Sequence, residues 1–306
     1  MLRAVAISLS AAAVAHAISY RWRMQQARRE SAERVPVGRD GIIPGAQPVA
    51  LTGSATHAAL LIHGFGDTPQ TVRALAEHLH ALHGWTVRAP LLPGHGRTLA
   101  DFDASGSAQW RAAVHSEYVA LKSQYPTVAL VGLSMGGALA TLEAAIDPSL
   151  PALVLLAPYL TPPASAQRMA PLAGVLNLVL PYLAGGDRVR SIFDPEARAL
   201  ALGYGGAPPK RVRDLVSVAH DARFAAADVR APTLLVHSRS DYRIPVPLAE
   251  SHPELFAAAV VRDQQWVTGC GHVITVDYCH EAVWALTADW LARYAGAPLA
   301  ASSRVL

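Results

Sequence analysis

The sequence predicts an α/β protein with a mostly parallel central sheet that is covered by helices on both faces. Short, continuously apolar runs alternate along the chain with longer segments in which apolar residues recur at helical spacing. Strands that alternate with helices pair in parallel, and a parallel sheet buried on both faces has apolar runs of this kind. A chain of 306 residues is long enough for one large domain that carries an insertion.

Six apolar runs are expected to form the strands of this sheet, because each is short and ends at a turn or loop. They lie at residues 58–62, 85–89, 127–131, 152–156, 232–237 and 259–266. Helices are expected where the apolar residues share one helical face. These segments lie at residues 68–82, 110–121, 138–143 and 277–294.

Between residues 158 and 230 the alternation of strands and helices lapses. The stretch 169–183 is helix-like and conspicuously apolar, and proline and glycine interrupt it. This segment is interpreted as a small cap inserted over one edge of the sheet. The α/β core is then formed by residues 51–157 and 231–296.

The N-terminal segment, residues 1–30, is interpreted as a signal or membrane-anchor segment. Its apolar, alanine-rich part has one arginine before it and four soon after it. It could be a cleaved secretory signal, a weak signal-anchor or an amphipathic interfacial stretch. The protein is therefore expected to be membrane-associated through residues 4–20, or exported if the segment is cleaved. Residues 31–50 are expected to be a linker and residues 297–306 a tail.

The composition indicates a globular protein and no nucleic-acid partner. The apolar fraction is 52% and the charged fraction is 16%, which argues against disorder. The net charge of +3 arises from residues 1–40, where seven arginines face three acids, so the remainder is close to neutral. No basic face that could bind nucleic acid is predicted.

The sequence Gly-Leu-Ser-Met-Gly at residues 132–136 directly follows the apolar run 127–131. A serine in a tight turn between a strand and a helix has a strained backbone, so the positions two before and two after it must be small. Both are glycine here, and residues 138–143 favour a helix after the turn. This context predicts that Ser134 is a nucleophile.

A serine hydroxyl is a poor nucleophile near neutral pH and requires a base that is itself oriented by an acid. In a sheet of this class the acid and then the histidine follow the serine in chain order, on loops after later strands. Asp241 comes shortly after the run 232–237, and His272 lies between the last run and the last helix. Ser134, Asp241 and His272 are therefore predicted to form the catalytic group.

The oxyanion of a tetrahedral intermediate requires N–H donors close to the serine. Met135 follows Ser134 at the start of a helix, where the helix dipole also favours negative charge. The second donor is expected from the loop 63–67 after the first predicted strand, with Phe65 supplying its backbone N–H. His63 is expected to shape this loop and not to act as a base.

No metal site is predicted. His78, His80 and His83 are close in sequence, but their spacing on a helix does not converge them with a carboxylate. Two cysteines exclude a disulfide framework and a cysteine-based zinc site. Cys270 and Cys279 could pair if the protein is exported, but the sequence does not supply the Cα separation that a disulfide requires.

Five features taken together resemble the α/β-hydrolase superfamily, and within it bacterial carboxylesterases and monoacylglycerol lipases. They are His-Gly-Phe-Gly at 63–66, Leu-Pro-Gly-His-Gly at 92–96, Gly-Leu-Ser-Met-Gly-Gly at 132–137, Asp241, and Gly-His-Val-Ile at 271–274. The resemblance covers roughly residues 55–295. It implies an α/β-hydrolase fold with a small cap, a Ser-His-Asp esterase, and neither a metal nor an organic cofactor. It also implies oxyanion donors at Phe65 and Met135.

The first functional hypothesis is a carboxylic-ester hydrolase that acts on a small-molecule or lipid ester. An acyltransferase with a non-water acceptor, or a ligand-binding protein without catalysis, are the alternatives. The apolar residues of 169–183 could line an acyl-chain pocket or pack the cap against the body. The oligomeric state is not legible from the sequence.

Overall fold

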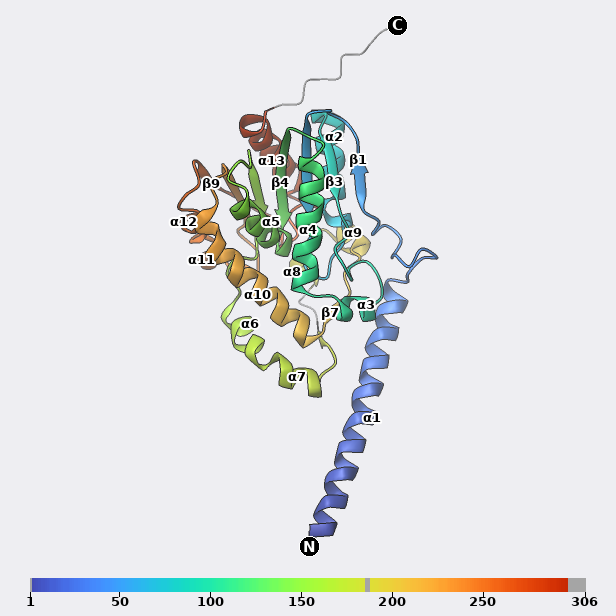
Figure 1. The fold of residues 1–306 in the computed structure, drawn as a ribbon. Helices are drawn as coiled ribbons and strands as arrows, with labels where there is room; N and C mark the ends of the chain where they lie inside the picture. The colour runs from blue at the N-terminus through green and yellow to red at the C-terminus, as the bar shows by residue number, and fades with distance from the viewer. Residues whose placement is uncertain (1, 185–187, 297–306) are drawn as a thin grey trace.

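The computed structural model describes residues 2–184 and 188–296, and it confirms the predicted α/β fold. Seven strands form one sheet in the order β1-β3-β2-β4-β5-β8-β9 (Figure 1). Neighbours in this sheet pair in parallel, except that β1 runs antiparallel to β3. The strands are β1 (Val49–Leu51), β2 (His57–Ile62), β3 (Thr86–Ala89), β4 (Thr127–Leu133), β5 (Leu153–Leu156), β8 (Thr233–Ser238) and β9 (Arg262–Val267).

Helices cover both faces of the sheet (Figure 1). Three of them, α4, α5 and α10, pack with one face, while α2 and α13 pack with the other. The helices of the body are α2 (Gln70–His83), α3 (Leu99–Ala104), α4 (Ser107–Lys122), α5 (Met135–Ile146), α10 (Pro209–Ala225), α11 (Val246–Ala249), α12 (His252–Leu255) and α13 (His280–Tyr294). The layered arrangement follows from side chains that alternate along each strand. In β2, for example, Leu60 enters one core and Leu61 the other.

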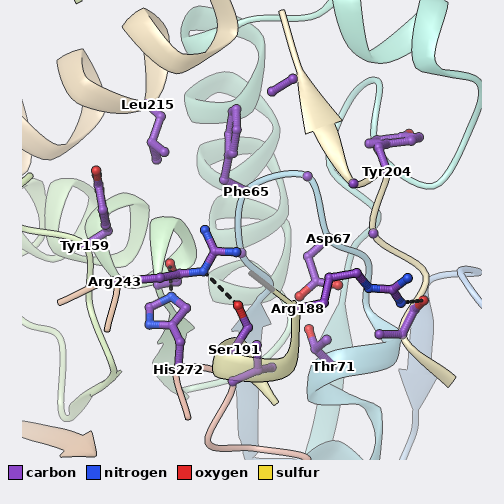
Figure 2. Close-up of a pocket in the computed structure, with 18 of the residues that line it drawn as sticks. Phe65, Asp67, Thr71, Tyr159, Arg188, Ser191, Tyr204, Leu215, Arg243 and His272 are labelled. Atoms are coloured by element: carbon purple, nitrogen blue, oxygen red, sulfur yellow. Dashed lines mark hydrogen bonds between the residues drawn. The ribbon is translucent and has the colours of Figure 1, made fainter. Parts of the chain in front are cut away.

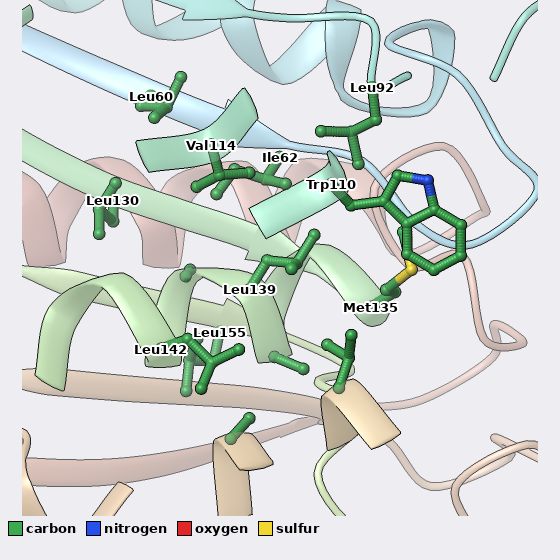
Figure 3. Packing of buried hydrophobic residues seen from close by; sticks show 14 of the residues in the cluster. Leu60, Ile62, Leu92, Trp110, Val114, Leu130, Met135, Leu139, Leu142 and Leu155 are labelled. Carbon is green, nitrogen blue, oxygen red and sulfur yellow. The ribbon is translucent and has the colours of Figure 1, made fainter. Parts of the chain in front are cut away.

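The larger core lies between the sheet and α4, α5 and α10. Figure 3 shows Leu60 and Leu130 of the sheet facing Leu139 of α5 and Trp110 of α4. Helix α5 directly follows the turn at residue 134 and is buried along most of its length. The core therefore fixes the position of the turn that precedes this helix.

Four features of the body differ from the predictions. Strand β1 was not predicted, because its three apolar residues are too short a run to be distinguished from the adjoining predicted linker, residues 31–50. The last strand begins at Arg262 instead of residue 259, and the last helix begins at His280 instead of residue 277. Helix α3 was also missed, although a capping box marks its start: the Thr98 hydroxyl accepts the Asp101 N–H, and the Asp101 carboxylate accepts the Thr98 N–H.

The predicted cap segment, residues 158–230, lies between β5 and β8. Its longest helix, α10, packs with the body, and its other elements are short. They are α6 (Ala164–Met169), the 3₁₀ turn η1 (Ala170–Leu172), α7 (Ala173–Val179), β6 (Leu183–Ala184), α8 (Arg188–Ser191), α9 (Pro195–Leu200), β7 (Gly206–Ala207) and, after α10, η2 (Ala226–Asp228). Strands β6 and β7 form a separate antiparallel pair. Of the apolar stretch 169–183, Val175 and Leu178 of α7 are 64% and 69% exposed, whereas Ala170 and Ala173 are buried and Tyr182 packs against the larger core.

The N-terminal segment is a single helix, α1 (Leu2–Arg34), which projects away from the body (Figure 1). Its contacts with the body include His16 Nε2 with the carbonyl of Leu178 at 2.8 Å and Arg28 Nε with the Tyr182 hydroxyl at 3.2 Å. Within the part of the chain that the structure describes, no helix combines the length and the apolar character needed to span a bilayer. Membrane association through residues 4–20 stays a prediction, and the predicted tail lies outside the described residues.

A pair of leucines tests the assignment of the larger core. Leu139 of α5 is 1% exposed, whereas Leu82 of α2 is 71% exposed. Leu139→Ala is expected to lower the free energy of unfolding by about 2–5 kcal/mol, because a cavity remains where the side chain packed. Leu82→Ala should change it by no more than about 0.5 kcal/mol. Urea unfolding measures both values, and equal losses would contradict the core described here.

Candidate active site

The predicted site residues meet at one edge of the sheet. Phe65 follows β2, Ser134 follows β4, Asp241 follows β8 and His272 follows β9. These strands are parallel to one another across the sheet, so their carboxyl ends lie along the same edge. Ligands of open α/β sheets bind at this edge, where strand order reverses.

The turn at Ser134 has the strained backbone that the sequence predicts. Its φ is 54° and its ψ is −116°, a conformation that residues other than glycine rarely adopt. The neighbouring glycines are required by space. A Cβ on Gly136 would overlap the carbonyl oxygen of Ile62, and one on Gly132 would overlap that of Gly136. The turn therefore packs directly against the end of β2.

The three predicted catalytic side chains form one chain of hydrogen bonds. Ser134 Oγ lies 2.9 Å from His272 Nε2, and His272 Nδ1 lies 2.7 Å from Asp241 Oδ2. A carboxylate only accepts hydrogen bonds, so Nδ1 carries the proton and Nε2 is left to accept the serine hydroxyl. Asp241 and His272 are both buried.

Asp241 is held by the backbone as well as by the histidine. Its Oδ1 accepts the N–H of Arg243 at 2.8 Å and that of Ile244 at 3.1 Å. Burial raises the pKa of Asp241, but the interaction with His272 and these hydrogen bonds outweigh it and bring the pKa below its ordinary value. The carboxyl group therefore stays ionised while it orients the imidazole.

The loop after β2 is shaped by His63, as predicted. Its Nε2 accepts the N–H of Leu92 at 3.1 Å, so Nδ1 carries the proton and donates to the carbonyl of Gly64 at 2.9 Å. Burial lowers the pKa of His63 to about 4, which keeps the ring neutral. A Cβ built on Gly64 would lie 3.5 Å from Ser134 Cβ, so this loop borders the serine.

The two predicted oxyanion donors flank Ser134. Met135 begins α5, and Phe65 lies in the loop that borders the serine. Among the described residues, no hydrogen bond uses the backbone N–H of either one. The Phe65 ring packs edge-on against Phe102 and Trp110, with centroids 5.2 and 5.9 Å away, which fixes the loop.

Ser134 and His272 line a cavity of about 520 Å³. Figure 2 shows His272 among the residues of this lining. Phe65, Tyr159 and Leu215 contribute apolar surface, while Asp67 and Arg243 contribute charge. Arg243 Nε donates to Ser191 Oγ at 3.1 Å, so a residue of the 158–230 segment touches a residue two positions after Asp241. Sequence reasoning missed Asp67 and Arg243, although each lies within two residues of a predicted site residue.

Asp67 is a titratable group of the cavity that the predicted catalytic group does not include. Burial raises its pKa to about 6, although the Thr68 N–H, the Thr71 hydroxyl and the charge of Arg243 act in the opposite direction. Ionisation of Asp67 therefore costs free energy in the folded protein.

The structure decides the pairing of the cysteines, which the sequence left open. Cys270 and Cys279 form a disulfide with their Cα atoms 5.8 Å apart. The bond closes the loop between β9 and α13, and this loop carries His272. The Ser238 hydroxyl, at the end of β8, donates to the carbonyl of Cys270 at 2.5 Å and anchors the base of the loop.

Comparisons with known proteins agree with this geometry. The sequence profile of a family described as serine aminopeptidase, S33, matches residues 53–277. The thermostable monoacylglycerol lipase of Bacillus sp. (strain H-257) is 28% identical over 257 residues, which is 83% of this chain and 98% of that protein. These matches confirm the predicted resemblance to α/β-hydrolases and to monoacylglycerol lipases.

Solved structures support the same fold. One, from work on the metagenome-derived lipolytic enzymes LipS and LipT, has a TM-score of 0.73 at 27% identity and covers 83% of this chain and 100% of that one. The monoacylglycerol lipase of Paleococcus ferrophilus has a TM-score of 0.67 at 22% identity, over 80% of this chain and 98% of that one.

The raised pKa of Asp67 leads to a testable pH dependence. Its pKa is about 6 in the folded protein and 3.8 for an exposed aspartate, so its contribution to stability falls as pH rises between these values. Asp67→Asn removes the cost of ionisation. The melting temperature of this variant, relative to the original protein, is expected to rise from pH 4 to pH 6 and to level off above about pH 7.

Asp147→Asn is the control for this measurement. Burial raises the pKa of Asp147, but hydrogen bonds from Ser149 and Tyr118 outweigh it and bring the pKa below its ordinary value. Asp147→Asn should therefore be less stable at pH 7, with a deficit that shrinks as the pH falls below about 4. A pH-independent difference for Asp67→Asn would contradict the raised pKa.

Proposed function

Because the chain belongs to the serine aminopeptidase, S33 family of α/β-hydrolases, we propose that it cleaves carboxylic esters through an acyl-enzyme on Ser134. The chain is an enzyme of the ester-hydrolase class, like the monoacylglycerol lipase that it resembles. The observation that supports the serine mechanism is the chain of hydrogen bonds from Ser134 through His272 to Asp241, at the base of a cavity.

In the first half of the reaction, Ser134 Oγ bonds to the acyl carbon while His272 Nε2 takes the hydroxyl proton. Asp241 keeps the proton on Nδ1 and stabilises the imidazolium that forms. The tetrahedral intermediate then collapses, the bond to the leaving alcohol breaks, and His272 gives its proton to that oxygen. The acyl group remains on Ser134 as an ester.

The second half repeats these steps with water in place of the serine. His272 removes a proton from water as its oxygen bonds to the acyl carbon, and the bond to Ser134 breaks as Oγ regains its proton. The products are a carboxylic acid and the free enzyme. In both halves the N–H groups of Phe65 and Met135 stabilise the oxyanion, and losing one such donor typically costs about 3–4 kcal/mol.

The 158–230 segment is proposed to act as a cap that shapes the cavity for the acyl group. Residues from several of its elements line the cavity, including Tyr159, Leu183, Ile192 and Leu215. These side chains are apolar or largely so. A lipid-like or medium-chain acyl group fits such a lining.

Ser134 and Ser165 both line the cavity, so a comparison of their alanine variants tests which serine is the nucleophile. Ser134→Ala is expected to lower the turnover of p-nitrophenyl esters by about 10³-fold or more, because no hydroxyl remains to form the acyl-enzyme. Labelling by a fluorophosphonate probe should disappear with it. Ser165→Ala should keep both activity and labelling. Unchanged turnover in Ser134→Ala would refute the assignment.

The acyl preference is tested with p-nitrophenyl esters from acetyl to palmitoyl. We expect kcat/KM to rise from the acetyl ester to medium-chain esters, because each methylene buried against the apolar lining contributes about 0.8 kcal/mol. A steady fall in kcat/KM from the acetyl ester onward would exclude the acyl-binding role of the cap and leave the serine mechanism standing.

A further inference from the structure

The carboxylate of Asp277 lies in the loop that follows His272 and is completely buried. It accepts four backbone hydrogen bonds. Oδ2 accepts the N–H of Gly271 at 2.7 Å and of Phe193 at 2.8 Å, while Oδ1 accepts those of Asp194 and Tyr278, both at 2.9 Å. Hydrogen bonds to a charged acceptor are stronger than neutral ones. Both oxygens are therefore fully engaged with the backbone.

These four bonds join two parts of the chain that are distant in sequence. Gly271 immediately precedes His272, whereas Phe193 and Asp194 follow α8 in the segment that forms the cavity wall. The carboxylate of Asp277 lies between them and satisfies N–H groups from both sides. It therefore fixes the loop between β9 and α13, called the histidine loop below, relative to residues 190–194, called the wall below.

The contact between the histidine loop and the wall is close. A Cβ on Gly271 would lie 2.6 Å from the carbonyl oxygens of Arg190 and Ser191, so only glycine allows this approach. On the other side of His272, the N–H of Val273 donates to the Ser191 carbonyl at 3.0 Å. Gly271, before the histidine, is thus held by a hydrogen bond to Asp277, and Val273, after it, by a hydrogen bond to Ser191.

We propose that Asp277 is a positioning residue for His272, and this inference rests on the function proposed above. Asp277 does not touch the reacting atoms. It holds the backbone on which the imidazole is mounted, so that Nε2 stays within reach of Ser134 while Nδ1 stays on Asp241. A displacement of about 1 Å in a catalytic group can cost about 100-fold in rate.

Asp277→Asn removes the negative charge and replaces one of the two acceptor oxygens by an NH₂ group, while the size of the side chain stays nearly constant. An amide has one oxygen and one NH₂ group, so it can accept only part of the four N–H groups and turns donors toward the rest. The Cys270–Cys279 disulfide still closes the loop in this variant. We expect kcat/KM for a p-nitrophenyl ester to fall by about 10- to 100-fold, mainly through kcat.

A double-mutant cycle with His272→Ala separates positioning from a general structural role. Serine hydrolases that lack a catalytic side chain retain measurable activity from the oxyanion hole and binding. If Asp277 acts through His272, Asp277→Asn should lower this residual activity by less than about twofold. An equal fall in both backgrounds would overturn the proposal.

Asp147→Asn is the matched control, since Asp147 also accepts several hydrogen bonds but lies at the far end of α5. It should lower the melting temperature without lowering kcat.

Should Asp277→Asn not fold, Asp277→Ser replaces it in the cycle, and failure of both to fold would overturn the proposal. Wild-type activity in Asp277→Asn alone would overturn only this inference, whereas wild-type activity in His272→Ala would refute the proposed function.

Discussion

The contact between the serine turn and the end of β2 is the constraint on which the site depends. Gly136 packs against the carbonyl of Ile62 so closely that a single methyl group would not fit. This contact brings the loop with Phe65 to the serine and holds the start of α5 beneath it. The strained backbone at Ser134 persists because the buried helix on one side and the buried strand on the other over-determine its position.

The catalytic group and the cavity wall are one connected structure. Ser191 receives hydrogen bonds from Val273 at its carbonyl and from Arg243 at its hydroxyl, so it contacts the loops of both His272 and Asp241. The residues proposed to bind the acyl group and those proposed to perform the chemistry therefore share their supports. A displacement of the wall segment would move Ser191 and, through its hydrogen bond with Val273, the residue that follows His272.

The sequence was sufficient to predict the parallel sheet and the residues that meet at its edge, because apolar runs and chain order encode both. The run 127–131 followed by a glycine-flanked serine specified the turn, and Asp241 and His272 followed from the position of the later strands. The structure places these three side chains within hydrogen-bonding distance. Their catalytic role is the proposal made above.

Other features have no local signal in the sequence. The pairing of Cys270 and Cys279 depends on a Cα separation that only the fold sets. The role of Asp277 depends on N–H groups more than 80 residues away, so its pattern in sequence is that of an ordinary helix start. The apolar stretch 169–183 predicts burial, yet Val175 and Leu178 are exposed. Burial depends on which other segments of the fold pack against the cap, and the local sequence does not specify this.

The last residue of α1 reaches the cavity region. Arg34 donates to the carbonyl of Gly203 at 2.8 Å, and its guanidinium fills the space beside Gly205, where any side chain would collide with it. Both glycines line the cavity. Removing residues 1–34 would therefore take away a side chain that contacts two residues of the cavity lining, and this would alter the rim of the cavity.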